Sequence, residues 1–309
     1  MLKTMRGTPI SSLCFGAMQF GRGANHAAAA AMFQQCRSAG INVFDTAHGY
    51  NDGLSEEWLG SFVQAEREDL FFATKLAATG GSARANILAQ FDISQRRHGL
   101  DCVDLLYLHR WDPDTPLSET FETLAGLQQD GKLRHVGVSN FAAWQVMKAN
   151  HVAQSFGLRI DAIQPMYNLV KRQAEAEILP MALDQNIAVL PYSPLGGGLL
   201  TGKYRGGGTG RLSSDQVYAA RYGADWMWDC ASKLTDLAAE LGHNAATLAV
   251  AWIARNPAIA APIISARSPE QLAPSLAAMG LNLVDDVYAA VTALSKTPDP
   301  ATDRSEETG

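Results

Sequence analysis

Short apolar runs alternate with longer amphipathic segments along most of the chain, a pattern typical of a parallel sheet with helices outside it. The apolar runs predict strands at residues 13–16, 41–45, 70–75, 103–109, 133–139, 160–164, 187–192 and 261–264. Helices are predicted between them, among others at residues 54–63 and 83–97. Asn25 is a suitable N-cap for a helix through the alanine run that follows, and Gly40 lies just past the end of that helix.

Six of the predicted strands end on a polar side chain, and these strand ends recur regularly. They are Asp45, Lys75, His109, Ser139, Gln164 and Tyr192, separated by 30, 34, 30, 25 and 28 residues. A (β/α)8 barrel of about 250 residues repeats every ~31 residues and builds its site at the carboxyl ends of its strands. We therefore predict an α/β fold with one (β/α)8 TIM barrel over residues 1–296. The alternative, a doubly wound open sheet, calls for a G-x-G-x-x-G turn after the first strand, and the sequence has none there.

Two segments fall outside the repeat. Residues 195–229 form a long glycine-rich loop after the seventh strand, which we interpret as a lid over the barrel mouth, the alternative being a disordered surface excursion. Residues 297–309 are polar and contain proline, and they are predicted to be a disordered C-terminal tail.

Composition narrows the functional classes. Of the 309 residues 47% are hydrophobic and 18% charged, and the net charge of −6 argues against nucleic acid and anionic membranes as partners. No apolar run approaches the ~18 residues of a membrane span, and no signal peptide is expected. The four cysteines contain no C-x-x-C pair, which favours reduced thiols in a cytoplasmic protein and predicts no metal site.

Four ionisable side chains at the predicted mouth suggest acid–base chemistry. Tyr50 follows the strand end at Asp45, and a phenol has an ordinary pKa of about 10, which a neighbouring ammonium lowers. Lys75 supplies that ammonium, Asp45 holds it charged, and His109 donates a hydrogen bond to a substrate oxygen. The set suits proton donation to a carbonyl oxygen, with the hydride coming from a cofactor.

The sequence motifs around these residues resemble those of a known family, the aldo-keto reductases. The motifs are Phe-Asp-Thr-Ala-His-Gly-Tyr at 44–50, Thr-Lys at 74–75, Tyr-Leu-His-Arg at 107–110, Gly-Val-Ser-Asn at 137–140 and Tyr-Ser-Pro-Leu at 192–195. The resemblance runs from about residue 15 to 276 and is strongest to bacterial branches that reduce sugars, aryl aldehydes and ketones.

The resemblance implies a reversible, NADPH-dependent reduction of an aldehyde or ketone, a small-molecule carbonyl substrate. Tyr50 is then the general acid, Lys75 lowers its pKa, Asp45 is the partner of Lys75, and His109 orients the carbonyl group. The resemblance leaves the natural substrate and the oligomeric state open.

The resemblance also implies a binding site for NADPH or NADP+. The nicotinamide end comprises Ser139, Asn140, Gln164 and the stacking ring of Tyr192. The pyrophosphate is lined by Ser193, Leu195, Gly197 and Lys203, and the adenosine end by Ser265, Arg267 and Gln271, with Arg267 on the 2′-phosphate. Ser265 stands where many members carry glycine, and Ser275 where many carry an asparagine that contacts adenine.

Five further residues are candidates for the substrate pocket, with core packing as the alternative for aromatic and methionine side chains. They are Met18, His48, Trp111, Trp226 and Trp228. Two alternative functions stay open. Lys75 has the chemistry of a Schiff-base aldolase. Some relatives of this fold are nucleotide-binding regulatory subunits of channels, although no extended segment precedes the predicted barrel here.

Overall fold

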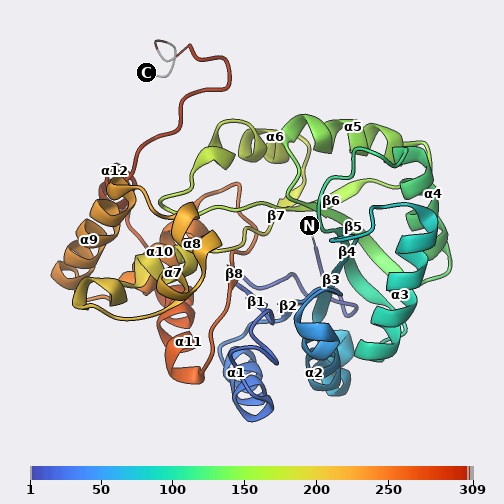
Figure 1. The fold of residues 1–309 in the computed structure, drawn as a ribbon, viewed down its shortest axis with the longest axis horizontal. Helices are drawn as coiled ribbons and strands as arrows, with labels where there is room; N and C mark the ends of the chain where they lie inside the picture. The colour runs from blue at the N-terminus through green and yellow to red at the C-terminus, as the bar shows by residue number, and fades with distance from the viewer. Residues whose placement is uncertain (1, 305, 307–309) are drawn as a thin grey trace.

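Eight parallel strands form a curled sheet at the centre of the molecule (Figure 1). The computed structural model describes residues 2–304 and 306. The strand order is β7-β6-β5-β4-β3-β2-β1-β8. The strands are β1 (Cys14–Gly16), β2 (Val43–Asp45), β3 (Phe71–Leu76), β4 (Val103–Leu108), β5 (Leu133–Ser139), β6 (Ile160–Gln164), β7 (Ala188–Val189) and β8 (Ile263–Ile264).

Backbone hydrogen bonds close the sheet between its two outer strands. The amide of Ala260 donates to the carbonyl of Val189 at 2.9 Å, and that of Ile263 to the carbonyl of Pro191 at 2.8 Å. The prediction of one (β/α)8 barrel is confirmed. β7 and β8 are shorter than predicted, so Tyr192 lies beyond β7, in an isolated bridge to Met166.

Helices surround the sheet on its outer side (Figure 1). Asn25 caps α1 by accepting from the amide of Ala28 at 2.9 Å, and Gly40 has a φ of +89°, as the sequence predicts for a helix end. The α-helices are α1 (His26–Ser38), α2 (Leu54–Val63), α3 (Arg84–His98), α4 (Leu117–Gln129), α5 (Ala143–Gln154), α6 (Ile178–Asp184), α7 (Arg211–Ser214), α8 (Gln216–Arg221), α9 (Asp225–Glu240), α10 (Ala245–Arg255), α11 (Pro269–Leu276) and α12 (Asp285–Ala293). The 3-10 helices are η1 (Asn51–Gly53), η2 (Gln64–Asp69), η3 (Gln173–Glu175), η4 (Gly196–Thr201), η5 (Lys203–Gly206) and η6 (Ala277–Gly280).

The alternation of side chains along the strands decides which residues face the barrel interior. Val43, Phe71 and Ala73 belong to an apolar cluster inside the barrel, whereas Phe44 and Phe72 pack in the larger cluster that includes the outer helices. Because successive side chains of a strand point to opposite faces, Asp45 and Lys75 continue the inward series at the carboxyl ends of β2 and β3. Both side chains are buried.

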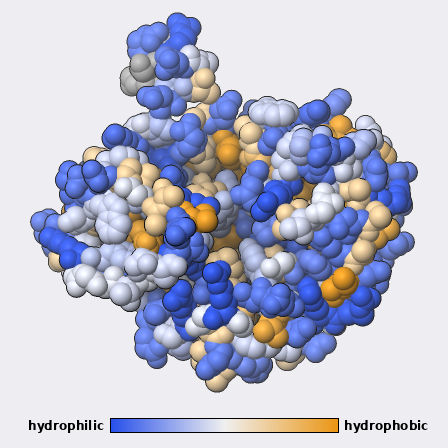
Figure 2. All heavy atoms as spheres, in the orientation of Figure 1, coloured by the Kyte–Doolittle hydropathy of each residue, from blue (hydrophilic) through white to orange (hydrophobic). Residues whose placement is uncertain are grey.

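The segment after β7 is more ordered than a plain loop. It contains η4, η5, α7 and α8, and α9 begins at Asp225, so the predicted loop of residues 195–229 is shorter than expected. Trp226 and Trp228 therefore lie in the first turn of α9 rather than at a loop end. The face in Figure 2 is hollowed near its centre, beside α7 and α8.

The C-terminal segment leaves the barrel. Residues 297–304 contain no helix or strand and extend away from the body of the molecule (Figure 1). Residues 305 and 307–309 lie outside the described part of the chain, and disorder of residues 297–309 stays a prediction. Among residues 2–304 and 306, every helix is too short or too polar to span a bilayer.

The buried imidazole of His98, the last residue of α3, makes the stability of the fold depend on pH. Its Nδ1 accepts from the amide of Leu100 at 3.1 Å, and its Nε2 is buried without a hydrogen-bond partner in the described chain. Burial, and then the charge of Arg67, lowers its pKa from 6.5 to about 4. Between these values the unfolded chain binds a proton that the folded chain does not bind, so stability falls as pH falls.

We expect His98→Asn to reduce the pH dependence of the free energy of unfolding by up to about 1.4 kcal/mol per pH unit. The window lies between pH 6.5 and about 4. Urea denaturation of both proteins across this window measures the difference, and other titrating groups cancel in the comparison. Equal slopes for wild type and variant would contradict the burial of a neutral imidazole.

Candidate active site

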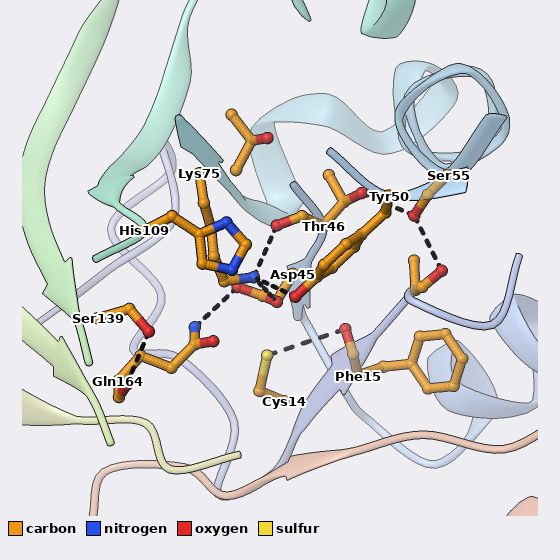
Figure 3. Close-up of polar contacts among 12 residues, drawn as sticks. Cys14, Phe15, Asp45, Thr46, Tyr50, Ser55, Lys75, His109, Ser139 and Gln164 are labelled. Atoms are coloured by element: carbon orange, nitrogen blue, oxygen red, sulfur yellow. Dashed lines mark hydrogen bonds and ion pairs between the residues drawn. The ribbon is translucent and has the colours of Figure 1, made fainter. Parts of the chain in front are cut away.

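A buried ion pair joins the ends of β2 and β3 (Figure 3). Lys75 Nζ forms an ion pair with Asp45 Oδ1 and donates to the carbonyl oxygen of Thr46 at 2.8 Å. Gln164 Nε2, from the end of β6, donates to Asp45 Oδ2 at 3.0 Å. Burial alone lowers the pKa of Lys75, but the attraction of Asp45 and Tyr50 outweighs burial and raises the pKa above its ordinary value. Lys75 is therefore a fixed positive charge.

Tyr50 is the third oxygen partner of the Lys75 ammonium. Lys75 Nζ lies 3.4 Å from the Tyr50 hydroxyl and 5.0 Å from the centre of its ring. Burial raises the pKa of Tyr50, and the charge of Lys75 opposes this effect without reversing it. The predicted influence of Lys75 on the Tyr50 pKa is present, but burial outweighs it because the phenol is removed from water. The hydroxyl is protonated at neutral pH.

His109 faces Tyr50 from the residue that follows β4. The two rings meet edge to face, with their centroids 5.9 Å apart. Burial, followed by the charges of Lys75 and Arg110, lowers the pKa of His109 to about 3. The imidazole is therefore neutral, and one of its ring nitrogens carries a proton that a substrate oxygen can accept. Its Nδ1 is buried and has no partner among the described residues.

Hydrogen bonds made by polar side chains connect the residues at the strand ends across the mouth of the barrel. Ser139 Oγ donates to the carbonyl of Gln164 at 2.9 Å, and Asn140 Nδ2 donates to the carbonyl of His109 at 2.9 Å. The Tyr192 hydroxyl donates to Asn140 Oδ1 at 2.7 Å. Four strand ends thereby hold one another in a fixed arrangement. Asn140 adopts a positive φ of 59°, an unusual conformation for a residue other than glycine.

A cavity of about 770 Å³ opens over this arrangement. Asp45, Tyr50 and His109 line it, while Lys75 lies beneath them. All the residues predicted to bind the cofactor also line it. They are Ser139, Asn140, Gln164, Tyr192, Ser193, Leu195, Gly197, Lys203, Ser265, Arg267 and Gln271.

Several features of the cavity fit an elongated nucleotide with phosphates. Gly197 and Gly198 have φ values of +67° and +98°, and a Cβ at Gly197 would lie 2.8 Å from the Tyr218 ring. Glycine therefore lets the Tyr218 ring pack closely against the backbone in the cavity wall. Lys203 and Arg267 line the same cavity and supply positive charge. Gln19 Oε1, beside Arg267, is buried and has no partner in the described chain. These residues fit a nicotinamide dinucleotide cofactor with its phosphate groups.

The predicted substrate-pocket residues are not brought together. Met18 lines the cavity, and the other four are absent from its lining. His48 Nδ1 lies 3.1 Å from Ser94 Oγ, and Trp111 packs edge to face against Phe141. Lys296 lies over the Trp226 ring, and Trp228 Nε1 donates to the carbonyl of Tyr222 at 3.0 Å. A role of His48, Trp111, Trp226 and Trp228 in substrate binding stays a prediction.

Some cavity residues escape prediction from the sequence. Ser275, which stands where many family members carry an adenine-contacting asparagine, does not line the cavity. It is buried, and its Oγ has no partner in the described residues. The additional polar lining residues come from irregular segments and short helices, whose sequence carries no periodic signal. They include Gln19, Arg110, Arg211, Tyr218, Arg221 and Asn244.

Comparison with known proteins settles the family. The model of the aldo/keto reductase family matches residues 12–296. The chain belongs to the aldo/keto reductase family. An uncharacterized oxidoreductase of Bacillus subtilis (strain 168), YrpG, is 32% identical over 305 residues, with 91% of each chain covered. Norsolorinic acid reductase stcV of Emericella nidulans is 30% identical over 311 residues, covering 93% of this chain and 78% of that protein.

A third relative is named as a channel subunit and not as an enzyme. A probable voltage-gated potassium channel subunit beta of Oryza sativa subsp. japonica is 32% identical over 316 residues, covering 94% of this chain and 95% of that protein. Family membership confirms the resemblance seen in the sequence. As an aldo/keto reductase, the protein is an NAD(P)H-dependent oxidoreductase whose general reaction is carbonyl reduction.

Proposed function

We propose that this aldo/keto reductase reduces an aldehyde or ketone with NADPH and that Tyr50 donates the proton. The observation that carries the proposal is the placement of the Tyr50 hydroxyl on the cavity surface, 3.4 Å from the buried ammonium of Lys75. A neutral His109 imidazole faces the same ring, so two hydrogen-bond donors converge where a carbonyl oxygen can bind.

The side chains divide the work on the carbonyl group. His109 and Tyr50 both donate hydrogen bonds to the substrate oxygen and so fix its position. When bound, NADPH supplies the hydride for the carbonyl carbon. As negative charge develops on the oxygen, Tyr50 gives up its proton, and the positive charge of Lys75 stabilises the phenolate that remains. Asp45 keeps Lys75 charged and oriented throughout, and the reverse oxidation uses the same groups.

The geometry argues against the Schiff-base alternative. An ammonium has three N–H donors, and Lys75 Nζ has three oxygen partners, on Asp45, Thr46 and Tyr50. Attack on a carbonyl carbon requires a neutral amine with a free lone pair, whereas Lys75 is charged, buried and absent from the cavity lining. Lys75 therefore acts on the substrate only through Tyr50.

A nucleotide-binding regulatory subunit of a channel is the second candidate function. The relative named as a potassium channel subunit beta favours it, because its similarity spans nearly the full length of both chains. Co-purification with a membrane protein, together with slow carbonyl turnover, would support this role.

We further propose a cytoplasmic location, which the four free cysteines favour.

Tyr50→Phe tests the proton donor. The substitution removes the hydroxyl and leaves the ring, so the turnover number for carbonyl reduction should fall by a factor of about 100 to 10,000. NADPH binding should change little, because the hydroxyl is assigned no cofactor contact. Steady-state rates and the dissociation constant for NADPH measure the two effects. A variant that kept more than about a tenth of wild-type turnover would exclude Tyr50 as the acid, provided that chemistry limits the rate.

Arg267→Ala tests the choice of cofactor. Arg267 lines the cavity just before α11, and we assign its guanidinium to the 2′-phosphate, the one group that distinguishes NADPH from NADH. Losing a hydrogen bond to a charged group should weaken NADPH binding by roughly 10- to 150-fold. NADH binding should barely change. Dissociation constants of both cofactors, at one ionic strength, decide between the outcomes. An equal loss for both cofactors, or a wild-type preference for NADH, would contradict the assignment.

A further inference from the structure

The charge of the cavity opposes that of the whole chain. The chain carries a net charge of −6. Asp45 is the one carboxylate in the cavity lining among the described residues, and Lys75 neutralises it. Five cationic side chains line the cavity, and none of them forms an ion pair with a carboxylate of the described chain. They are Arg110, Lys203, Arg211, Arg221 and Arg267.

The proposed cofactor accounts for part of this charge. Lys203 and Arg267 are assigned to its phosphates above. Arg211, on α7, is engaged with Tyr218: its Nη1 donates to the Tyr218 hydroxyl at 3.0 Å, and its guanidinium lies 4.8 Å from the ring centre. Two cations of the lining remain unassigned, Arg110 and Arg221.

Both unassigned arginines lie at the catalytic end of the cavity. Arg110 directly follows His109 and is exposed. Arg221, at the end of α8, lies 5.1 Å from the ring centre of Tyr218. Burial raises the pKa of Tyr192, and the charge of Arg221 is the chief influence that opposes it, so Arg221 is close to the predicted nicotinamide platform.

We propose that the substrate of this reductase is an anionic carbonyl compound whose carboxylate is bound by Arg221 and Arg110. The proposal rests on the carbonyl reduction proposed above and names its substrate class. A guanidinium matches a carboxylate in planar, bidentate geometry, which adds geometric specificity to the attraction between the charges. The neutral His109 and Tyr50 contribute no competing negative charge at the mouth.

Two aromatic aldehydes of similar shape test the proposal. 4-Carboxybenzaldehyde carries the anionic group, and methyl 4-formylbenzoate replaces it with a neutral ester. We expect wild-type kcat/KM to favour the acid by about tenfold or more, the effect of a hydrogen bond to a charged group. Arg221→Gln and Arg110→Gln should each lower the ratio of acid to ester by a similar factor. Arg205→Gln, which removes the same charge from a residue that pairs with Asp236 outside the cavity lining, should preserve the ratio.

The outcomes separate this proposal from the reductase assignment. Reduction of the ester without preference for the acid would overturn the anionic substrate and leave the reductase standing. An equal loss for both aldehydes in Arg221→Gln and Arg110→Gln, with weaker NADPH binding, would assign the arginines to the cofactor instead. No reduction of either aldehyde with NADPH or NADH would count against the reductase itself.

A second observation, independent of the cavity charge, concerns the loop that carries Tyr50. Asn51, Asp52 and Gly53 all have positive φ values, of 52°, 54° and 98°. Two of these are not glycine, and such residues hold a left-handed conformation only when their surroundings enforce it. Asn51 Nδ2 donates to the carbonyl of Phe20 at 2.7 Å, which fixes one side of the loop.

Arg97, near the end of α3, fixes the other side. Its Nη1 donates to the carbonyl of His48 at 2.9 Å, and its Nη2 to the carbonyl of Asp52 at 3.3 Å, on either side of Tyr50. Its Nη1 also lies 3.4 Å from Glu56 Oε2. The Glu56 side chain is fully buried, and its other oxygen accepts from Thr74 Oγ1 at 2.7 Å, next to Lys75.

We infer that Arg97 is a positioning residue that holds Tyr50 against Lys75 although it lies outside the cavity lining. Its planar guanidinium reaches two backbone carbonyls and one carboxylate at once, which a single ammonium does not reproduce. Gly53 accommodates it, because a Cβ there would lie 2.2 Å from Arg97 Nε. The Glu56–Arg97 pair thus ties the Tyr50 loop to the strand of Lys75.

A double-mutant cycle with Tyr50→Phe tests this role. Arg97→Gln should lower kcat by about tenfold or more, with a smaller change in KM, and Arg97→Lys should recover part of the loss. In the Tyr50→Phe background, Arg97→Gln should change the residual rate by less than about twofold, because Arg97 acts through Tyr50. Arg96→Gln is the control, since Arg96 is an exposed neighbour on the same helix. The same loss in both backgrounds would reduce Arg97 to a structural residue, and if Arg97→Gln fails to fold, Arg97→Lys carries the cycle.

Discussion

The arrangement depends on one ion pair buried at the top of the barrel interior. The side chains of Lys75 and Asp45 are 0% and 4% exposed, and charges removed from water are stable only when paired and hydrogen-bonded. Both conditions are met, since Lys75 has three oxygen partners and Asp45 also accepts from Gln164. Removal of either partner would leave an uncompensated buried charge, at a cost of about 3–5 kcal/mol.

This ion pair connects the fold to the chemistry. The period of the strands turns Asp45 and Lys75 inward, and the parallel register brings the ends of β2 and β3 side by side. Tyr50 gains its electrostatic partner because its loop folds back over this point. Gln164 extends the network to β6, and Asn140 and Tyr192 extend it along the mouth. A charge fixed before any substrate binds needs no reorganisation during the reaction, which is the general advantage of preorganised sites.

The sequence predicts most of this framework because strand ends obey a simple rule. Regular spacing and polar strand ends locate the barrel mouth, and the family motifs name the residues that line the cavity. The sequence does not reveal the direction of side chains on irregular loops. His48 turns toward Ser94, outside the cavity lining, while Tyr218 and Arg221 enter the lining from short helices without periodicity. The sequence also does not reveal the direction in which the Tyr50 pKa shifts. Burial opposes the effect of Lys75, and the extent of burial is visible only in the folded chain.

The most direct test of carbonyl reduction at this site is the fate of the hydride when 4-carboxybenzaldehyde is reduced. The measurement is the mass spectrum of the alcohol formed with NADPH that carries two deuterium atoms at nicotinamide C4. Direct transfer predicts one deuterium on the former carbonyl carbon of every product molecule, and none on that carbon when the same reaction is run with unlabelled NADPH in deuterated water. An alcohol without deuterium from the labelled cofactor would contradict direct transfer to a carbonyl held by Tyr50 and His109.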